Sequence, residues 1–175
     1  MPLGLIHIRE DSPLLPEVTK LYLSAFPANE RRPLKVLLAD QSDASEVMAV
    51  CDDGRYVGLV ILLTWRDITH IIYFAVIDAL RERGYGSHIL QMVQETHPGQ
   101  RIIADVEAPN NDADNNLQRE RRIAFYERNG FLPTEIRYTW RQENYIIVAA
   151  NGMVSEEEFE AFWTYFYTEK DGFDY

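Results

Sequence analysis

The sequence predicts one domain of the α/β class, more specifically α+β, in which strands and helices follow one another along the chain. The 175 residues suit one domain, and a hydrophobic content of 46% is enough for one sizeable core. Apolar residues recur at helical spacing in some segments and in strand-like runs in others. Because no repeat or linker interrupts these segments, we assign 1–175 to one domain, with 153–175 as a C-terminal amphipathic helical extension.

The first half of the chain reads as strand, helix, bend, short helix and then three strands. The bend, 26–33, contains two prolines, which interrupt the helical spacing. A turn at Asp52-Asp53-Gly54 separates two β-rich runs and predicts a hairpin, since glycine accepts a positive φ. The expected strands are 5–9, 46–51, 56–63 and 69–76, and the expected helical runs are 14–26 and 36–39.

The second half begins with a glycine-rich loop, 81–87, that opens a helix directly after a strand. His97-Pro98-Gly99 ends that helix, and Asn129-Gly130 ends the next one because glycine relieves a left-handed cap. Ser155 and Glu158 form a capping box before a final helix whose aromatic residues share one face. The remaining strands are expected at 101–107, 136–140 and 145–149, with a polar loop at 110–116.

Composition limits the partners that we expect. With 17 Lys and Arg against 28 Asp and Glu, the chain has a net charge of -11 and should repel nucleic-acid phosphates. The single cysteine, Cys51, excludes an intramolecular disulfide and indicates a reducing compartment. No apolar run approaches a membrane span, and the N-terminus reads as a strand, so we expect a cytoplasmic protein without membrane contact. His7, His88 and His97 lack metal-ligand spacing, so no metal is expected.

The glycine-rich loop is the strongest functional signal in the chain. Backbone N–H groups at such a turn can point at an anion, and the dipole of the following helix adds to the attraction. Gly84 and Gly86 keep side chains out of the way, while Arg81 and Arg83 add cationic donors. This pattern favours a phosphate ligand, although two glycines could also serve only to make a tight turn.

Two motifs together resemble the GNAT family of acyl-CoA-dependent N-acetyltransferases. The first is the strand end Tyr73-Phe74-Ala75-Val76 followed by Arg81-x-x-Gly84-x-Gly86, and the second is Tyr126-x-x-x-Gly130-Phe131. The resemblance covers most of the chain except the final helix. It implies a central mixed, mostly antiparallel sheet flanked by helices, whose fourth and fifth strands, 69–76 and 101–107, splay apart.

The resemblance also implies acetyl-CoA as the acetyl-donor cosubstrate, lying in the slot between the splayed strands. The backbone of Phe74, Ala75 and Val76 would pair with its pantetheine arm like an added strand. The pyrophosphate would be held by the loop residues Arg81, Arg83, Gly84, Tyr85, Gly86 and Ser87. Arg119 stands where many members carry an asparagine, which puts one pantetheine contact in doubt.

Acetyl transfer to an amine needs a group that accepts a proton from nitrogen and one that donates a proton to sulfur. His70, aligned with the glutamate base of some members, and Glu107, at the end of the next strand, are the two candidate bases, with Glu30 further behind. A base acting through water, or none, remains open. The resemblance makes Tyr126 the general acid and the N–H of Val76 the donor to the oxyanion.

The acceptor is the least determined part of the prediction. We expect a primary amine, with a small molecule slightly favoured over a protein, and a pocket that includes Glu30, Arg31 and Trp65. The 110–116 loop and the aromatic C-terminal helix are further candidates for its walls. An acyl-CoA-binding module without turnover is the alternative function, and both a monomer and a homodimer remain open.

Overall fold

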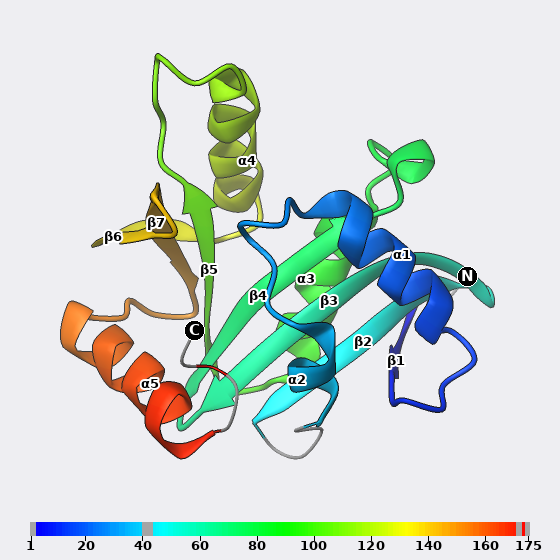
Figure 1. Ribbon diagram of the computed structural model, residues 1–175. Helices are drawn as coiled ribbons and strands as arrows, with labels where there is room; N and C mark the ends of the chain where they lie inside the picture. The colour runs from blue at the N-terminus through cyan, green and yellow to red at the C-terminus, as the bar shows by residue number, and fades with distance from the viewer. Residues whose placement is uncertain (1–2, 40–43, 171–172, 174–175) are drawn as a thin grey trace.

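The computed structural model describes residues 3–39, 44–170 and 173. Within this part, helices cover both faces of a central sheet (Figure 1). The strands are β1 Leu3–His7, β2 Ser45–Asp52, β3 Arg55–Trp65, β4 Ile68–Val76, β5 Arg101–Glu107, β6 Leu132–Trp140 and β7 Glu143–Ala150. The helices are α1 Leu15–Ala25, α2 Leu34–Ala39, the 3-10 turn η1 Asp78–Leu80, α3 Tyr85–Thr96, α4 Asn116–Arg128 and α5 Glu156–Glu169.

The sheet is mixed and mostly antiparallel, as predicted. Its seven strands lie in the order β1-β2-β3-β4-β5-β7-β6, and among these described strands only β4 and β5 pair in parallel. The β2-β3 hairpin turns at Asp53 and Gly54, both of which have a positive φ. The expected α+β domain with a mixed sheet is therefore confirmed.

Two apolar cores hold the helices on the sheet. On one face, α1, α2 and α5 contribute Val18, Leu37 and Phe162 to a core that includes Ile61 and Ile103. On the opposite face, α3 and α4 pack through residues such as Leu90 and Tyr126 against Leu62 and Val106. Each strand therefore sends alternate side chains into different cores. A ligand can therefore contact both faces of the sheet only where two neighbouring strands separate.

The sheet opens between β4 and β5. Their pairing is limited to Ile68–Ile71 against Arg101–Ala104, and beyond Ala104 the pairing of β5 continues with β7 alone in the part of the chain described. Figure 1 shows the two strands side by side at one end and apart at the other. A bulge at Ile72, which is skipped in the register with β3, bends β4 at the point where the strands separate. The predicted splay of the fourth and fifth strands is thus confirmed.

The element boundaries differ from the prediction mainly at β6 and β1. β6 begins at Leu132 rather than at 136, because Leu132 and Pro133 already pair with β7 before an irregularity that interrupts the alternation up to Arg137. β1 ends at His7 rather than at Arg9, although the N–H of Ile8 still donates to the carbonyl oxygen of Val47 at 2.8 Å. Strand ends near bulges are poorly marked in a sequence because the period of two is lost there.

Candidate active site

The free edge of β4 faces the slot between β4 and β5. The N–H of Ile77 donates to the carbonyl oxygen of Val57 at 2.9 Å, which fixes the alternation of the β3-β4 ladder. By this alternation Ala75 bonds toward β3, whereas the backbone N–H and C=O groups of Phe74 and Val76 point away from β3. Since β5 has already diverged, those groups face the slot and can pair with an extended ligand.

The 81–87 loop has the backbone geometry of an anion site. Glu82 has φ 64° and Gly84, the N-cap of α3, has φ 83°, so left-handed residues alternate along the loop. The first bond back from α3 runs from the N–H of His88 to the carbonyl oxygen of Gly84, at 3.2 Å. The N–H groups of Tyr85, Gly86 and Ser87 precede that bond and are available to a ligand.

The side chains of this loop are mostly turned to solvent. Arg81 is exposed and forms an ion pair with Asp78 at 2.9 Å, and Arg83 and Ser87 are also exposed. The hydroxyl of Tyr85 donates to Asp52 at 2.6 Å, which ties the start of α3 to the end of β2. A ligand at this loop would therefore contact mainly backbone N–H groups, while the exposed arginine side chains lie around them.

Gly86 has a packing role as well as a backbone role. A β-carbon at this position would lie 3.0 Å from the ring of Phe125, tighter than ordinary contact. Phe125 of α4 stacks in turn on Phe74 of β4, with ring centroids 6.4 Å apart. Glycine thus lets α3, α4 and β4 converge beside the slot.

Tyr126 lies in the core on the same sheet face as α3. Its side chain is 5% exposed and packs edge-to-face with Phe125 and Phe131. Burial raises the pKa of its hydroxyl, and the charge of Asp105 adds to this effect. The phenol is therefore neutral near pH 7 and able to donate a proton.

His70 and Asp105 lie on the opposite face and form one hydrogen-bonded group with Tyr138. The Nε2 of His70 is 3.3 Å from one oxygen of Asp105, and the hydroxyl of Tyr138 donates to the other at 2.6 Å. Burial raises the pKa of Asp105, but the bonds from His70 and Tyr138 and the charge of Arg32 outweigh it, so the pKa is lowered. The ionised carboxylate only accepts, which assigns the Nε2 proton to His70 and leaves Nδ1 as the other site.

The Nδ1 atom of His70 has no hydrogen-bond partner among the described residues, and the side chain is 1% exposed. Its ring packs against Phe159, Phe162 and Trp163 of α5. A buried imidazole nitrogen without a partner is unusual and is satisfied most simply by a ligand or a water.

Glu107 is held in an ion-pair group rather than free in the slot. Arg119, which is 6% exposed, contacts Glu107 at 2.7 Å and Glu143 at 3.1 Å, and Arg122 lies 3.6 Å from Glu107. This group joins α4 to β5 and β7. Arg119, which stands where the sequence resemblance implies an asparagine, therefore has a structural role here.

Glu30 lies on the 26–33 bend, which two buried tyrosines hold in place. The hydroxyl of Tyr73 donates to the carbonyl oxygen of Glu30 at 2.7 Å, and the N–H of Arg32 donates to Tyr73 and Tyr22 at 2.9 and 3.0 Å. Burial raises the pKa of the Glu30 carboxyl, and the nearby negative charges of Glu107 and Asp105 contribute, against a lowering by Arg122. Glu30 thus lies near the acidic end of β5.

A cavity of about 400 Å³ lies on the α5 side of the sheet, and His70, Ile72 and Asp105 are part of its wall. Its other lining residues come from the bend, from β6 and from α5: Arg32, Tyr138, Thr139, Trp140, Phe159, Glu160, Trp163, Thr164 and Tyr167. Ile72 and Asp105 are the first residues beyond the β4-β5 ladder, so the cavity adjoins the apex of the slot.

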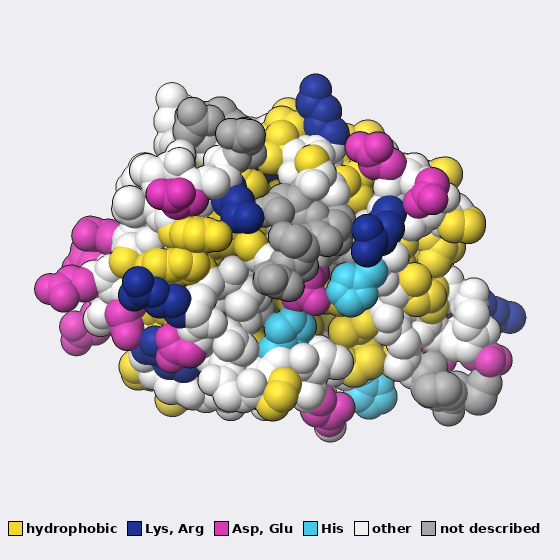
Figure 2. Space-filling model, turned by 90° about the horizontal axis from the view of Figure 1, so that it is seen from below, with side chains coloured by type: hydrophobic (Ala, Val, Ile, Leu, Met, Phe, Trp, Pro, Cys, Tyr) yellow, Lys and Arg dark blue, Asp and Glu magenta, His cyan; other side chains and the backbone are white. Residues whose placement is uncertain are grey.

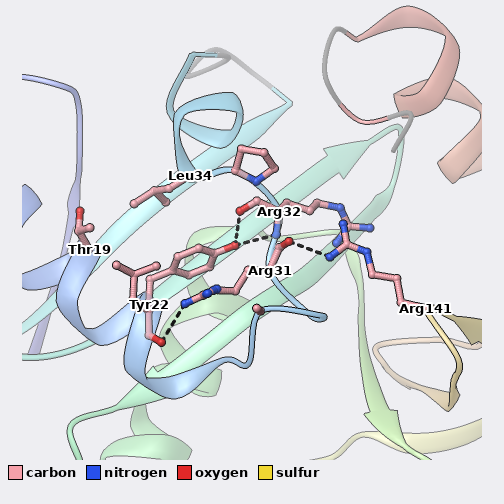
Figure 3. A pocket seen from close by; sticks show the side chains of 9 residues that line it. Thr19, Tyr22, Arg31, Arg32, Leu34 and Arg141 are labelled. Atoms are coloured by element: carbon pink, nitrogen blue, oxygen red, sulfur yellow. Dashed lines mark hydrogen bonds between the residues drawn. The ribbon is translucent and has the colours of Figure 1, made fainter.

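None of the three predicted acceptor residues lines this cavity, and Glu30 lines neither of the two cavities described here. Arg31 lines a separate cavity of about 360 Å³ between α1 and the bend, where its guanidinium donates to the carbonyl oxygen of Leu23 at 3.0 Å (Figure 3). Trp65 lines neither of these two cavities and instead stacks on Tyr165 of α5, with ring centroids 5.3 Å apart. The 110–116 loop contributes to neither lining.

The sequence analysis did not single out Asp105, Tyr138 and Trp140, which line the cavity on the α5 side of the sheet. One signal was present for Asp105, since it is a lone charge inside the otherwise apolar run Ile102–Val106. A charge in a buried strand needs a partner, and here the partners are His70 and Tyr138. Nothing in the sequence placed β6 against α5, so Tyr138 and Trp140 had no such signal.

The surface view adds one observation on charge. Figure 2 shows the underside of the molecule, where Lys and Arg side chains are scattered among acidic and apolar ones, and histidines gather near the centre with an acidic side chain beside them.

No helix in the described ranges 3–39 and 44–170 has the length and apolar content to cross a membrane.

Comparison with known proteins identifies the family. A putative GNAT-family acetyltransferase from Bacteroides thetaiotaomicron superimposes with a TM-score of 0.79, at 22% identity over 95% of this chain and 98% of that one. A GNAT-family acetyltransferase from Elizabethkingia anophelis with acetyl-CoA bound gives 0.57, at 13% identity over 85% and 97%. The ribosomal-protein-S18-alanine N-acetyltransferase from Escherichia coli gives 0.59, at 20% identity over 89% and 97%.

At these identities the structural matches show a shared fold. Curated protein sequences gave no match. The acetyltransferase (GNAT) family model matches residues 15–131, which is more than half of the chain. The matched span includes the 81–87 loop and the motif Tyr126-x-x-x-Gly130-Phe131. The chain therefore belongs to the GNAT acetyltransferase family.

Proposed function

We propose that this protein transfers an acetyl group from acetyl-CoA to a primary amine by direct attack in a ternary complex. The observation that carries the proposal is the backbone of Phe74 and Val76 that points away from β3, together with the 81–87 loop, whose Gly86 lies close to the Phe74 ring. An extended arm with a pyrophosphate at one end fits these two features together. The relative from Elizabethkingia anophelis with acetyl-CoA bound supports this choice of ligand.

Acetyl-CoA would supply an activated thioester, so that an N–C bond forms as the C–S bond breaks and one proton passes from nitrogen to sulfur. We assign the N–H of Val76, which faces the slot, to the carbonyl oxygen as it gains negative charge. Tyr126 holds a proton in a buried phenol on the cofactor side and is the proposed acid.

We propose His70 as the group that accepts the proton from the amine. Its Nε2 proton is held by Asp105, which leaves Nδ1 as an acceptor in the neutral ring. Glu107 is a weaker candidate because two arginines already compensate its charge. Glu30, whose pKa is raised, is the second choice.

Titration calorimetry with acetyl-CoA tests the cofactor site. Gly84→Glu places a carboxylate at the phosphate turn and should weaken binding at least 10-fold. Gly99→Glu is the matched control: both glycines have a positive φ and open space where a side chain would begin, but Gly99 follows the far end of α3. Equal binding by both variants and the unsubstituted chain would remove the loop from the proposal.

Turnover assays test the assigned groups. Tyr126→Phe and His70→Gln should each lower kcat by about 10²-fold or more, while Glu107→Gln should have a smaller effect. Full acetyl-CoA binding without transfer to any amine would favour the alternative, an acyl-CoA-binding module.

A further inference from the structure

The cavity bounded by α5 and β6 adjoins the place where an acetyl group would be presented. The β4-β5 ladder ends at Ile71 and Ala104, and the next residues, Ile72 and Asp105, both belong to the cavity wall. The proposed cofactor features lie on the α3 and α4 face, whereas this cavity lies on the α5 face. An amine in the cavity would therefore approach the apex of the slot from the side opposite the cofactor.

Aromatic side chains contribute a large part of the wall of this cavity, although fewer than half of its lining residues. Five of its lining residues are Phe, Tyr or Trp: Tyr138, Trp140, Phe159, Trp163 and Tyr167. Trp163 stacks on Tyr167 with ring centroids 5.5 Å apart, and both come from α5. Flat apolar walls favour a flat apolar ligand, because each buried ring surface adds transfer free energy.

The charges around the cavity favour a cation. Asp105 and Glu160 carry two negative charges, against one positive charge on Arg32. The guanidinium of Arg32 lies 4.7 Å from the ring centre of Trp140 and 4.8 Å from that of Trp163. The two indoles thus hold Arg32 in the wall of the cavity. The charges of Asp105, Glu160 and Arg32 sum to a negative value, which favours a cationic ligand.

Two elements that contribute to the cavity wall, the 26–33 bend through Arg32 and β6 through Trp140, are connected beside it. Arg141, in the β6-β7 turn, donates to the carbonyl oxygens of Asn29 and Arg31 at 3.1 and 2.9 Å. These bonds tie the turn to the 26–33 bend and join two walls of the cavity. A volume of about 400 Å³ suits a small molecule rather than an extended chain.

Resting on the proposed acetyl transfer, we infer that the acceptor is an arylalkylamine, a primary amine on a short chain attached to a flat aromatic ring, and that Trp163, Tyr167 and Glu160 select it. The residues that line the cavity from β6 and α5 all lie beyond the span of the family model, which ends at residue 131. This selectivity would thus belong to this chain rather than to the shared core.

Acetyl transfer to 2-phenylethylamine, n-propylamine, spermidine and a tetrapeptide with a free N-terminus tests the inference. We expect kcat/KM for 2-phenylethylamine to exceed that for n-propylamine by about 10²-fold, since a buried ring contributes about 2–3 kcal/mol. Trp163→Ala should reduce this ratio about 10-fold and Trp163→Phe should keep most of it. Tyr167→Ala, at an exposed position, should also reduce it if Trp163→Ala does not fold.

Glu160→Gln should raise KM for 2-phenylethylamine several-fold at low salt. Glu157→Gln is the matched control, because it removes the same charge from an exposed position of α5 outside the cavity. Quenching of tryptophan fluorescence by 2-phenylethylamine, with CoA present, reports binding independently of turnover.

The outcomes distinguish a failure of the inferred amine class from a failure of the proposed acetyl transfer. Transfer to spermidine or to the peptide without preference for 2-phenylethylamine would overturn the inference and leave acetyl transfer standing. Absence of acetyl-CoA binding would instead overturn the proposed function. With acetyl-CoA binding intact, saturable quenching that Tyr167→Ala weakens and Glu157→Gln does not would support the arylalkylamine pocket, and absence of quenching and of preference would reject it.

Discussion

At the scale of single residues, the carboxyl of Glu30 lies where its ionised form is disfavoured. Burial and the neighbouring acids Glu107 and Asp105 raise its pKa above the ordinary value of 4.5. The folded state therefore holds this proton more tightly than the unfolded state does. The wild type should lose stability as pH rises from about 4.5 through the raised pKa.

Glu30→Gln removes the carboxyl whose ionisation destabilises the folded state. The variant should match the wild type below pH 4.5 and be more stable at pH 8, by roughly 0.5 kcal/mol, as expected for a partly screened charge. Urea denaturation at both pH values measures the difference. Glu10→Gln, at an exposed carboxyl in the loop after β1, controls for the change in net charge, and equal gains in both variants would contradict the local explanation.

At the scale of elements, the position of α5 depends on one arginine at the start of β5. The guanidinium of Arg101 donates to both oxygens of Asp67 at 3.0 Å, to Glu158 at 2.8 Å and to the carbonyl oxygen of Met153 at 3.0 Å. Glu158 also completes the capping box of α5 with Ser155. Hydrogen bonds from Arg101 and from the N–H of Ser155 lower the pKa of Glu158 to about 2.

Arg101→Ala should therefore destabilise the protein by about 1–3 kcal/mol near pH 7, since it removes charged hydrogen bonds. A lowered carboxyl pKa contributes stability above the ordinary value, and this contribution is lost as pH falls toward 2. The gap between variant and wild type, measured by urea denaturation, should accordingly narrow from pH 5 to pH 2. Arg101→Lys keeps the charge but not the planar fork, and a gap independent of pH would argue against the ion pair.

The order of elements and the glycine-rich loop before α3 could be predicted from the sequence, whereas the residues that line the cavity beside α5 could not. Gly84 and Gly86 lie close together in sequence, so local spacing was sufficient to indicate a tight turn that opens α3. The His70, Asp105 and Tyr138 group joins three strands, and their meeting depends on the sheet order and on the bulge at Ile72. Such contacts have no local signature in a single sequence.

The same contrast explains the separate positions of Trp65 and Arg31. Both residues were expected to line the acceptor pocket. In the structure, α5 covers Trp65, and the 26–33 bend turns Arg31 toward α1. Helical spacing predicted the apolar face of α5 without indicating where it would dock. Its docking site was set by long-range packing against His70 and Trp65.

At the scale of the whole molecule, the sheet consists of two parts, β1–β4 and β5–β7, that share a short parallel ladder. Arg141 provides a second connection, because it reaches from the β6-β7 turn to the carbonyl oxygens of Asn29 and Arg31. Its guanidinium also lies 4.2 Å from the ring centre of Trp140. The connection holds the 26–33 bend against the far part of the sheet.

Arg141→Ala should loosen this bend without unfolding the protein. Amide hydrogen exchange of Arg32, whose N–H donates to Tyr22 and Tyr73, should become at least 10-fold faster, while exchange in the central strand β3 stays the same. If the proposed amine binds in the cavity, its KM should rise about 10-fold, because two hydrogen bonds of about 1 kcal/mol each then no longer hold the cavity wall. Arg137→Ala is the matched control, since the Arg137 guanidinium donates to carbonyls of its own strand. If both variants exchange alike, the two parts of the sheet are held together by the ladder and the cores, and Arg141 has no such role.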